Sequence, residues 1–246
     1  MNMSESWITV TTTLPQSLGP GAADSHPEIR TERLVIRPLA QSDLAPFHRL
    51  RSQSAFMKHT TTGLPDASLR DTQMKLDRLL NAPASPDAFP FPTYFGVFLR
   101  TTGELIGDGG VHLLASPACG WPELGCKFAS EYCGRGYGTE FLRAFTAWWW
   151  ALPRCGANGG DAVPVRIRVH PASVVWDRKA GGGVEGSDVA VEQLYAWVAP
   201  DNYASQRMVI KTGLEHFVTW DHPVKKIPVL GWRQSRCRRT AYPSKL

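Results

Sequence analysis

The stretch ELGCKFASEYCGRGYGTEFLRAF, residues 123–145, decides the fold of this chain. Its first part, ELGCKF, predicts a β-strand, and the segment from Thr139 predicts a helix because its apolar side chains recur at helical spacing. The cluster GRGYG, residues 134–138, joins the two. A helix that opens on glycines exposes N–H groups without partners, and its dipole favours an anion there. This order predicts a phosphate-binding loop, to which Arg135 can add a charge-assisted hydrogen bond.

The spacing of the glycines separates this loop from two other nucleotide-binding motifs. A Walker A loop carries Lys and then Ser or Thr after its last glycine, whereas Thr139 follows Gly138 directly. A dinucleotide fingerprint has the spacing G-x-G-x-x-G and an acidic residue about twenty positions later in a second strand, and this chain has neither. A glycine-rich turn that binds no ligand stays open as the alternative when the cluster is considered alone.

Strand and helix patterns alternate through the rest of the chain, which predicts an α/β (α+β) fold. The segments that predict strands are TERLVIRPL (31–39), YFGVFL (94–99), LIGDGGVHLL (105–114), EQLYAWV (192–198), LEHFVTW (214–220) and a last strand within 229–242. The segments that predict helices are one that begins with Ser42 and Asp43 as caps, one with Leu69, Met74, Leu76, Leu79 and Leu80 as its apolar residues, and NYASQRMVIKTG (202–213).

Two regions fall outside this alternation. Residues 1–28, rich in Thr, Ser, Gly and Pro, predict a disordered N-terminal tail. At about 155–188, glycine-rich flanks surround the alternating run VRIRV (165–169), which predicts an insertion with one short extra strand. We therefore expect a single domain over residues 29–246 that carries this insertion.

The composition limits the classes of protein to which the chain can belong. No apolar run is long enough to span a bilayer, and the first residues lack the basic and apolar regions of a secretory signal. The five cysteines include no C-x-x-C pair, which argues against a disulfide framework and against a metal site. These features predict a cytoplasmic protein that needs neither a membrane nor a metal.

The net charge of +5 favours anionic partners without choosing among them. Several basic residues near the C-terminus could line one strand, either as a solvated face or as a binding patch: Arg233, Arg236, Arg238 and Arg239. Because no base-reading motif accompanies these arginines, we do not expect a nucleic acid to be the partner.

Five segments, taken together, resemble one known family. The loop from Cys133 to Gly138 is similar to the acetyl-CoA pyrophosphate loop of the GNAT superfamily, and is closest to the branch of ribosomal-protein N-terminal acetyltransferases. The other four segments agree with that branch in type and order: TERLVIRPL, GELIG, ELGCKF and NYASQRMVIKTGL. The resemblance covers most of residues 31–220.

The resemblance implies a fold and a reaction. The fold would be a mixed central sheet of six to seven strands, flanked by about four helices and splayed between strands 4 and 5. The reaction would be transfer of an acetyl group from acetyl-CoA, by direct attack on the thioester, to a primary amine of a small molecule or peptide. The protein would work without a metal, as a monomer or a homodimer. A catalytically weak module that binds acyl-CoA or another protein is the alternative, because the tyrosine that many GNAT enzymes use as general acid is replaced here by Val209.

The resemblance also implies which residues hold the donor. The backbone of the fourth strand, near Phe128, would contact the pantetheine arm and polarise the thioester oxygen, and the glycine loop would hold the diphosphate. Asn202 would contact the pantetheine or cap its helix, and Ser205 would be either the acid to the departing thiolate or a solvated helix residue. The expected donor-binding residues are Lys127, Phe128, Ala129, Gly134, Arg135, Gly136, Tyr137, Gly138, Thr139 and Asn202.

A general base must reach the acceptor amine directly or through one water. Glu123, at the start of the fourth strand, is the first candidate, and His112 on the third strand is the second. Each also has a structural alternative: a glutamate at a strand end is commonly just exposed, and a single strand histidine commonly packs. The resemblance implies that the acceptor pocket forms from the loops HTTTGLP (59–65) and DHPVKKIPVLGW (221–232), to which the insertion at about 155–188 could contribute.

Overall fold

The hairpin predicted from YFGVFL and LIGDGGVHL lies in the middle of a large mixed sheet. The computed structural model describes residues 7–16, 27–60, 62–81, 91–154, 162–177, 188–223 and 226–236. Its strands are β1 (Ile8–Thr12), β2 (Ile29–Arg30), β3 (Leu34–Arg37), β4 (Tyr94–Leu99), β5 (Leu105–Leu113), β6 (Glu123–Phe128), β7 (Val165–Val169), β8 (Gln193–Val198), β9 (Glu215–Asp221) and β10 (Pro228–Ser235). Its helices are α1 (Leu44–Arg51), α2 (Ser54–Met57), α3 (Leu69–Asn81), α4 (Tyr137–Ala151) and α5 (Tyr203–Lys211).

The main sheet has the strand order β2-β3-β4-β5-β6-β8-β10-β9. Every neighbouring pair is antiparallel except β6 and β8, which are parallel and pair only at Glu123 and Tyr195. The two strands therefore separate beyond that point, which confirms the predicted splay between the fourth and fifth strands. The predicted α/β class is also confirmed. Within the described residues the sheet has eight strands rather than six to seven, because the two-residue strand β2 adds one edge.

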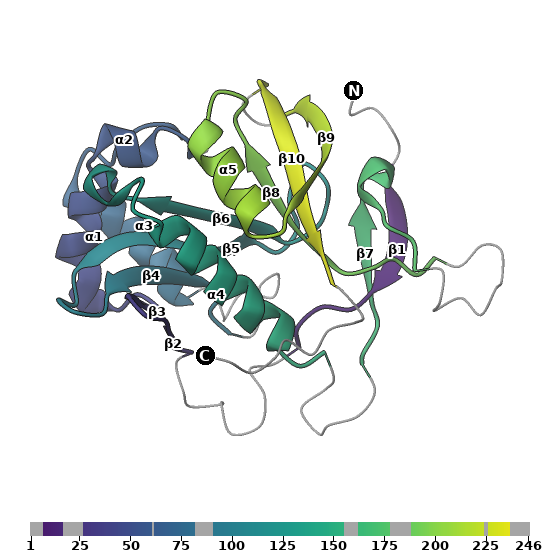
Figure 1. Ribbon diagram of the computed structural model, residues 1–246, viewed down its shortest axis with the longest axis horizontal. Helices are drawn as coiled ribbons and strands as arrows, with labels where there is room; N and C mark the ends of the chain where they lie inside the picture. The colour runs from purple at the N-terminus through teal and green to yellow at the C-terminus, as the bar shows by residue number, and fades with distance from the viewer. Residues whose placement is uncertain are drawn as a thin grey trace.

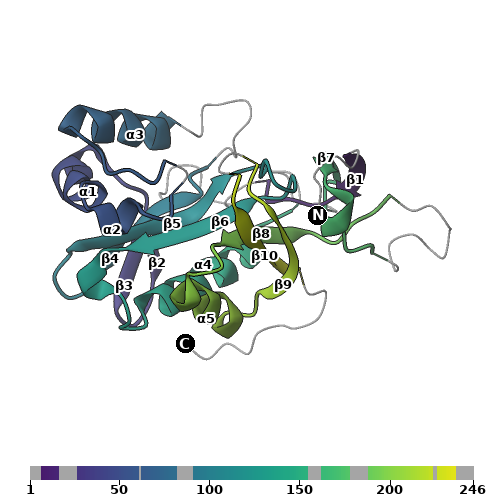
Figure 2. The same ribbon diagram turned by 90° about the horizontal axis from the view of Figure 1, so that it is seen from above.

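Helices cover the two faces of the sheet as separate layers (Figures 1 and 2). The helices α1, α2 and α3 lie on one face, and α4 and α5 lie on the other. On α4 the side chains of Phe141, Phe145 and Trp149 are fully buried against the sheet, as their helical spacing predicts. On α3 only part of the apolar pattern is buried: Leu76 is in the core, whereas Leu69 and Met74 are about half exposed, at 48% and 45%.

The N-terminal segment corrects one expectation. Residues 8–12 form β1, which pairs antiparallel with β7 along its whole length, so a disordered tail is the wrong prediction for this part of residues 1–28. Val10 on β1 is completely buried. The run ITVTT is short and rich in Thr, and its partner lies more than 150 residues later in the chain. Local sequence therefore could not show what orders it. The strand β7 itself is the one predicted inside the insertion.

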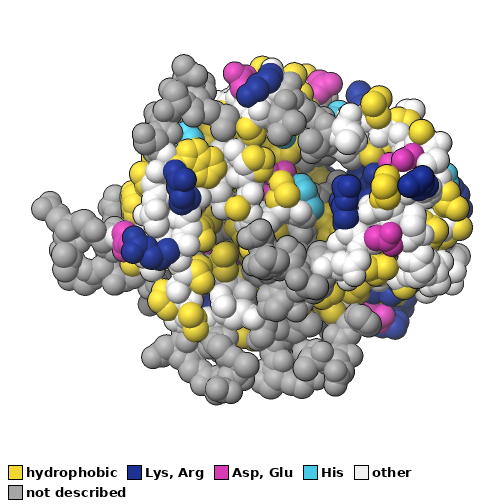
Figure 3. Space-filling model, turned by 180° about the vertical axis from the view of Figure 1, so that it is seen from behind, with side chains coloured by type: hydrophobic (Ala, Val, Ile, Leu, Met, Phe, Trp, Pro, Cys, Tyr) yellow, Lys and Arg dark blue, Asp and Glu magenta, His cyan; other side chains and the backbone are white. Residues whose placement is uncertain are grey.

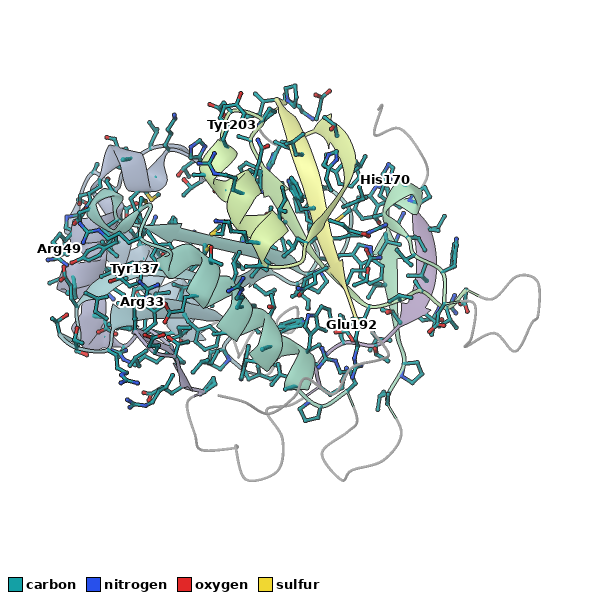
Figure 4. All side chains as sticks on the ribbon, viewed as in Figure 1. Arg33, Arg49, Tyr137, His170, Glu192 and Tyr203 are labelled. Atoms are coloured by element: carbon teal, nitrogen blue, oxygen red, sulfur yellow. The ribbon has the colours of Figure 1, made fainter. Side chains whose placement is uncertain are left out.

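A buried ion pair fixes this N-terminal segment to the main sheet. The guanidinium of Arg154 donates to both carboxylate oxygens of Glu192, at 3.1 and 2.7 Å, and both side chains are almost completely buried. The hydroxyl of Thr13, just after β1, donates to the same carboxylate at 2.9 Å. Arg154 also donates to the carbonyl of Trp149 at 2.8 Å, near the end of α4. The pair therefore joins the N-terminal segment, α4 and the start of β8 (Figure 4).

Candidate active site

The splay leaves one edge of β6 without a neighbouring strand. The N–H of Ala129 donates to the carbonyl of Ile106 on β5, at 2.9 Å. Because successive N–H groups of a strand point to opposite edges, the N–H of Phe128 points toward the splay. The N–H of Ala129 is therefore not available for a backbone contact with a pantetheine arm, whereas the N–H of Phe128 has the orientation that such a contact needs.

The glycine loop ends at the N-terminus of α4, on the same side of the sheet. Gly134 and Gly136 have positive φ angles of 76° and 84°, a conformation that favours glycine. The first hydrogen bond inside the helix runs from the N–H of Glu140 to the carbonyl of Gly136, at 3.0 Å. The N–H groups of residues 137–139 precede it and can point toward an anion. No heavy atom outside its chain neighbours lies within 4 Å of a Cβ built on Gly134, so space for a phosphate exists beside the loop.

Arg33 holds this loop against the rest of the fold. Its guanidinium donates to the Glu140 carboxylate at 2.7 Å and to the carbonyl of Arg135 at 3.0 Å. The same group lies 4.4 Å from the centre of the Tyr137 ring, and Figure 4 shows the two side chains together at the start of α4. Thr31 adds a hydroxyl hydrogen bond to the Glu140 carboxylate at 2.6 Å. The turn between β2 and β3 thus fixes the position of the predicted diphosphate loop.

The helix α5 packs closely against α4 beside the loop. A Cβ on Gly138 would lie 2.5 Å from the sulfur of Met208, so a glycine at 138 allows the two helices to approach. Asn202 is the N-cap of α5, because its Oδ1 accepts a hydrogen bond from the N–H of Ser205 at 3.2 Å. The hydroxyl of Ser205 makes no hydrogen bond with any described residue. Val209 is buried in the core and supplies no acid.

The two predicted bases are hydrogen-bonded to each other. The Nε2 of His112 lies 3.0 Å from the Oε1 of Glu123. A register shift between Val111 and Leu113 places a β-bulge at His112, and bulges commonly redirect a side chain next to a functional site. His112 is exposed, whereas Glu123 is only 3% exposed. Among the described residues the other ring nitrogen of His112, Nδ1, has no hydrogen-bond partner.

Glu123 is surrounded by donors. The hydroxyl of Ser116 donates to its Oε2 at 2.5 Å, and the indole N–H of Trp197 donates to its Oε1 at 3.0 Å. Burial alone would raise the pKa of Glu123, but the hydrogen bonds from His112, Ser116 and Trp197 outweigh it and hold the pKa below the ordinary value. Glu123 is therefore a buried anion that orients His112, and its oxygens are already occupied.

A second polar cluster lies on the same face of the sheet. The ammonium of Lys127 and the hydroxyl of Tyr94, the latter at 2.9 Å, donate to the Oδ1 of Asp108, which is completely buried. Burial lowers the pKa of Lys127, although the Asp108 carboxylate partly offsets that effect. The ring of Tyr94 lies between the two clusters, with its centre 6.1 Å from the His112 ring.

Glycines separate the two clusters. Gly110 and Gly125 are paired across β5 and β6, between the His112 and Glu123 pair on one side and Asp108 and Lys127 on the other. Because glycine has no side chain, the surface of the sheet between the two clusters lies lower than the side chains on either side of it. Figure 3, which views this face, shows a hollow near its middle with histidine on one side and Lys or Arg on the other.

Sequence reasoning found part of this site. The loop, Glu123 and His112 carry local signals, and the structure brings the last two into contact. Ser116, Trp197 and Arg33 were missed, because each acts on a residue far away in the chain and has no local pattern. Asp108 carried a signal that could have been used, since it is a charged residue inside the otherwise apolar run LIGDGGV.

Within the described residues, no three His, Cys, Asp or Glu side chains lie close enough together to hold a metal ion. None of the helices described there is long and apolar enough to cross a membrane.

A splayed mixed sheet, with a glycine loop and helix N-terminus beside the splay, defines the class of acyl-CoA-dependent acetyltransferases. Comparison with known proteins gives the family: the model of the acetyltransferase (GNAT) domain matches residues 33–215. The chain belongs to this family. The sequence has no significant match among the curated proteins.

Solved structures share the fold at low sequence identity. A GNAT-family acetyltransferase from Bacillus anthracis superposes with a TM-score of 0.55 at 18% identity, over 85% of this chain and 99% of that chain. A protein from Vibrio cholerae, provisionally described as a ribosomal-protein-serine acetyltransferase, gives a TM-score of 0.53 at 14% identity, over 85% of this chain and 97% of that chain. The structure of AAC(6')-Ib in complex with ribostamycin and coenzyme A gives 0.52 at 16%, over 83% and 94%.

Proposed function

We propose that this acetyltransferase moves the acetyl group of acetyl-CoA to a primary amine of a small molecule or peptide, by direct attack of the amine on the thioester. The observation that carries the proposal is the pair His112 and Glu123, 3.0 Å apart, on β5 and β6 at the point where β6 leaves β8. The related structure of AAC(6')-Ib holds coenzyme A and ribostamycin, which supports a donor and an acceptor meeting in this fold.

The donor fits the residues of the splay and the loop. The diphosphate would bind the N–H groups of residues 137–139 and the side chain of Arg135, which is exposed. The pantetheine arm would run along the free edge of β6, where the N–H of Phe128 could donate to the thioester oxygen and stabilise negative charge on it. Each contact uses a group that the fold already orients, so binding costs little reorganisation.

His112 is the base in this proposal, and Glu123 is its positioning residue. The buried Glu123 carboxylate accepts the Nε2 proton of His112, which leaves Nδ1 with a lone pair. Nδ1 takes a proton from the acceptor as the amine nitrogen forms its bond to the acetyl carbon. The carbon–sulfur bond then breaks, and the departing thiolate takes a proton from water, either directly or through the Ser205 hydroxyl, which water reprotonates as it gives up its proton. The His112 imidazolium then returns its proton to solvent. This assignment reverses the order expected from the sequence, because Glu123 is buried and its oxygens already accept three hydrogen bonds.

The donor site is tested by calorimetric titration of acetyl-CoA into the wild-type protein and two variants, Gly134→Asp and Gly134→Asn. Asp and Asn have nearly the same shape, both tolerate a positive φ, and the space around Gly134 is open. A negative charge beside the diphosphate should weaken binding at least about tenfold more in the Asp variant than in the Asn variant. Equal loss in both variants would argue that the loop does not hold the diphosphate.

Transfer itself is tested by release of thiol from acetyl-CoA with a panel of primary amines. We expect turnover with at least one amine, and a fall in kcat of about 100-fold or more in His112→Gln with little change in acetyl-CoA affinity. Binding of acetyl-CoA without turnover of any amine would favour the alternative, a catalytically weak module that binds acyl-CoA. Buried Val209, at the place of the usual acid, is the observation that keeps this alternative open.

A further inference from the structure

One cation beside the Tyr94 ring has no ion-pair partner among the described residues. The ammonium of Lys75, on α3, makes no hydrogen bond and no ion pair with any described residue. Its Nζ lies over the face of the Tyr94 ring, 6.0 Å from the ring centre. Lys75 is half-buried, because it flanks the buried side chains of Thr72 and Leu76 on the inner side of α3. A cation in this position is costly unless an anion compensates it.

The neighbouring charges leave Lys75 uncompensated. Burial, and then repulsion from Lys127, lower the pKa of Lys75, although the Asp108 carboxylate opposes the shift. Asp108 makes no ion pair with Lys75: its Oδ1 accepts from Lys127 and Tyr94, and its Oδ2 is buried without a hydrogen-bond partner. Arg51 also repels Lys75, but its own charge is paired with Asp66 at 2.6 Å. Among the described residues, Lys127 and Arg51 thus each have a carboxylate partner, whereas Lys75 has none.

The hollow between the two polar clusters, called the groove from here on, has its acidic side chains buried beneath its surface. Asp108 is 0% exposed and Glu123 is 3% exposed, so a ligand in the groove meets neither of them directly. Lys75, in contrast, is accessible to solvent in part. An entering molecule therefore meets the ammonium of Lys75 and the imidazole of His112. Both side chains border the same ring: the Lys75 Nζ is 6.0 Å and the His112 ring centre is 6.1 Å from the centre of Tyr94.

We propose that the acceptor carries a carboxylate as well as its amine, and that Lys75 binds the carboxylate while the amine reaches His112. The proposal rests on the function proposed above and narrows the acceptor to amino acids, short peptides or similar compounds in which both groups fit beside one tyrosine ring. Lys75 is a specificity-determining residue in this arrangement: it contacts the end of the acceptor that does not react. Neither its role nor the acceptor class follows from the glycine loop.

The test measures binding rather than turnover. The full-length protein is saturated with coenzyme A, which has no acetyl group to transfer, and titrated with glycylglycine, alanylglycine and phenylalanylglycine and with the C-terminal amide of each. At neutral pH each pair differs by one negative charge. A charge-assisted hydrogen bond to Lys75 should make at least one acid bind about tenfold more tightly than its amide. Lys75→Met should remove the difference. Lys211→Met, which removes an exposed lysine of α5 outside the groove, should keep it.

Three results would overturn the proposal: equal binding of every acid and its amide, no binding of any of them, or a preference for the acid that survives in Lys75→Met. A Lys75-dependent preference without release of thiol from acetyl-CoA would leave the carboxylate site standing and reject the transfer reaction. Turnover of amines without a preference for the acid would support the transfer reaction and reject the carboxylate site. Far-ultraviolet circular dichroism and the unfolding midpoint of Lys75→Met show whether that variant is folded, and Lys75→Gln, which keeps a polar group without charge, repeats the measurement.

Discussion

The two halves of the candidate site are built in different ways. The proposed donor half consists mainly of backbone groups, from the continuous segment 133–139 and the free edge of β6, with the Arg135 side chain as an addition. The acceptor half is made by side chains that come from separate parts of the chain: His112 on β5, Glu123 on β6, Trp197 on β8 and Lys75 on α3. A site made of backbone groups depends on the conformation of the chain, whereas a site made of side chains depends on which amino acid stands at each position.

This difference determines how each half should respond to substitution. In the donor half, the loop depends on its two left-handed glycines and on the helix N-terminus that follows them. In the acceptor half, one truncation leaves several groups without partners. We therefore expect the largest effects in the acceptor half, and smaller ones wherever a side chain only supports the backbone of the donor half.

Glu123→Ala should have the largest effect. It removes a buried carboxylate and leaves the donors of His112, Ser116 and Trp197 without an acceptor. Loss of one partner from such a buried network costs about 3–5 kcal/mol of unfolding free energy. Urea unfolding measures the loss. Glu123→Gln keeps one carbonyl acceptor, so it should lose clearly less stability while still lowering kcat. If Glu123→Ala costs under about 1 kcal/mol, the network is not a structural unit.

The pH dependence of the unfolding free energy also tests the contribution of the Glu123 carboxylate. Because the folded state lowers the pKa of Glu123 below its ordinary value of 4.5, its contribution to stability is present above that value and is lost as the pH falls through the lower folded pKa. The pKa values of Asp66 and Glu140 shift in the same direction. Hydrogen bonds from Arg51 and Thr72 to Asp66, and from Thr31 and Arg33 to Glu140, together with the charges of the two arginines, outweigh the effect of burial. The wild type should therefore lose stability below about pH 4.5, with a shallower slope in Glu123→Gln. An unchanged slope would show that Glu123 does not contribute.

Arg33→Met should have an intermediate effect, on the donor rather than on the fold. Arg33 positions the loop through Glu140 and the carbonyl of Arg135, but its side chain is 41% exposed, so the ion pair adds little stability. We expect acetyl-CoA to bind about tenfold more weakly by calorimetry, while the unfolding free energy falls by about 1 kcal/mol or less. Arg30→Met is the matched control, because Arg30 is more exposed and pairs only with Glu28 among the described residues. If the two variants weaken acetyl-CoA binding equally, Arg33 does not position the loop.

The same contrast explains how far the sequence could predict the structure. The loop 133–139, the helix after it and the strands beside it have local signals, in glycine spacing and apolar periodicity, and the structure confirms the predicted elements. The splay was implied by the resemblance and is confirmed by the single residue pair between β6 and β8. The sequence predicts Glu123 and His112 as two separate candidate bases, and nothing in their spacing predicts that they form a hydrogen bond.

What the sequence could not predict depends on contacts between distant residues. Trp197 reaches Glu123 from 74 positions away, and Arg33 reaches Glu140 from 107 positions away. The strand β1 looks like part of a disordered tail until its partner β7 is known. No periodicity encodes these pairings, because each needs the completed sheet. The acceptor half depends on them most, and so it was the less predictable half.

The smallest expected effects come from α5, where Asn202 has two possible roles. Its Oδ1 caps the helix by accepting the N–H of Ser205, and its amide could also contact the pantetheine. Asn202→Ala should lose about 1 kcal/mol of unfolding free energy with the cap. Asn202→Asp keeps the cap, because an Asp oxygen accepts the same N–H, but it has no amide to donate. Weaker acetyl-CoA binding in the Asp variant would therefore support a pantetheine contact, and unchanged binding would show that Asn202 only caps the helix.

Ser205→Ala should lower kcat only a few-fold if water can also protonate the thiolate. An unchanged kcat would leave water as the sole proton donor.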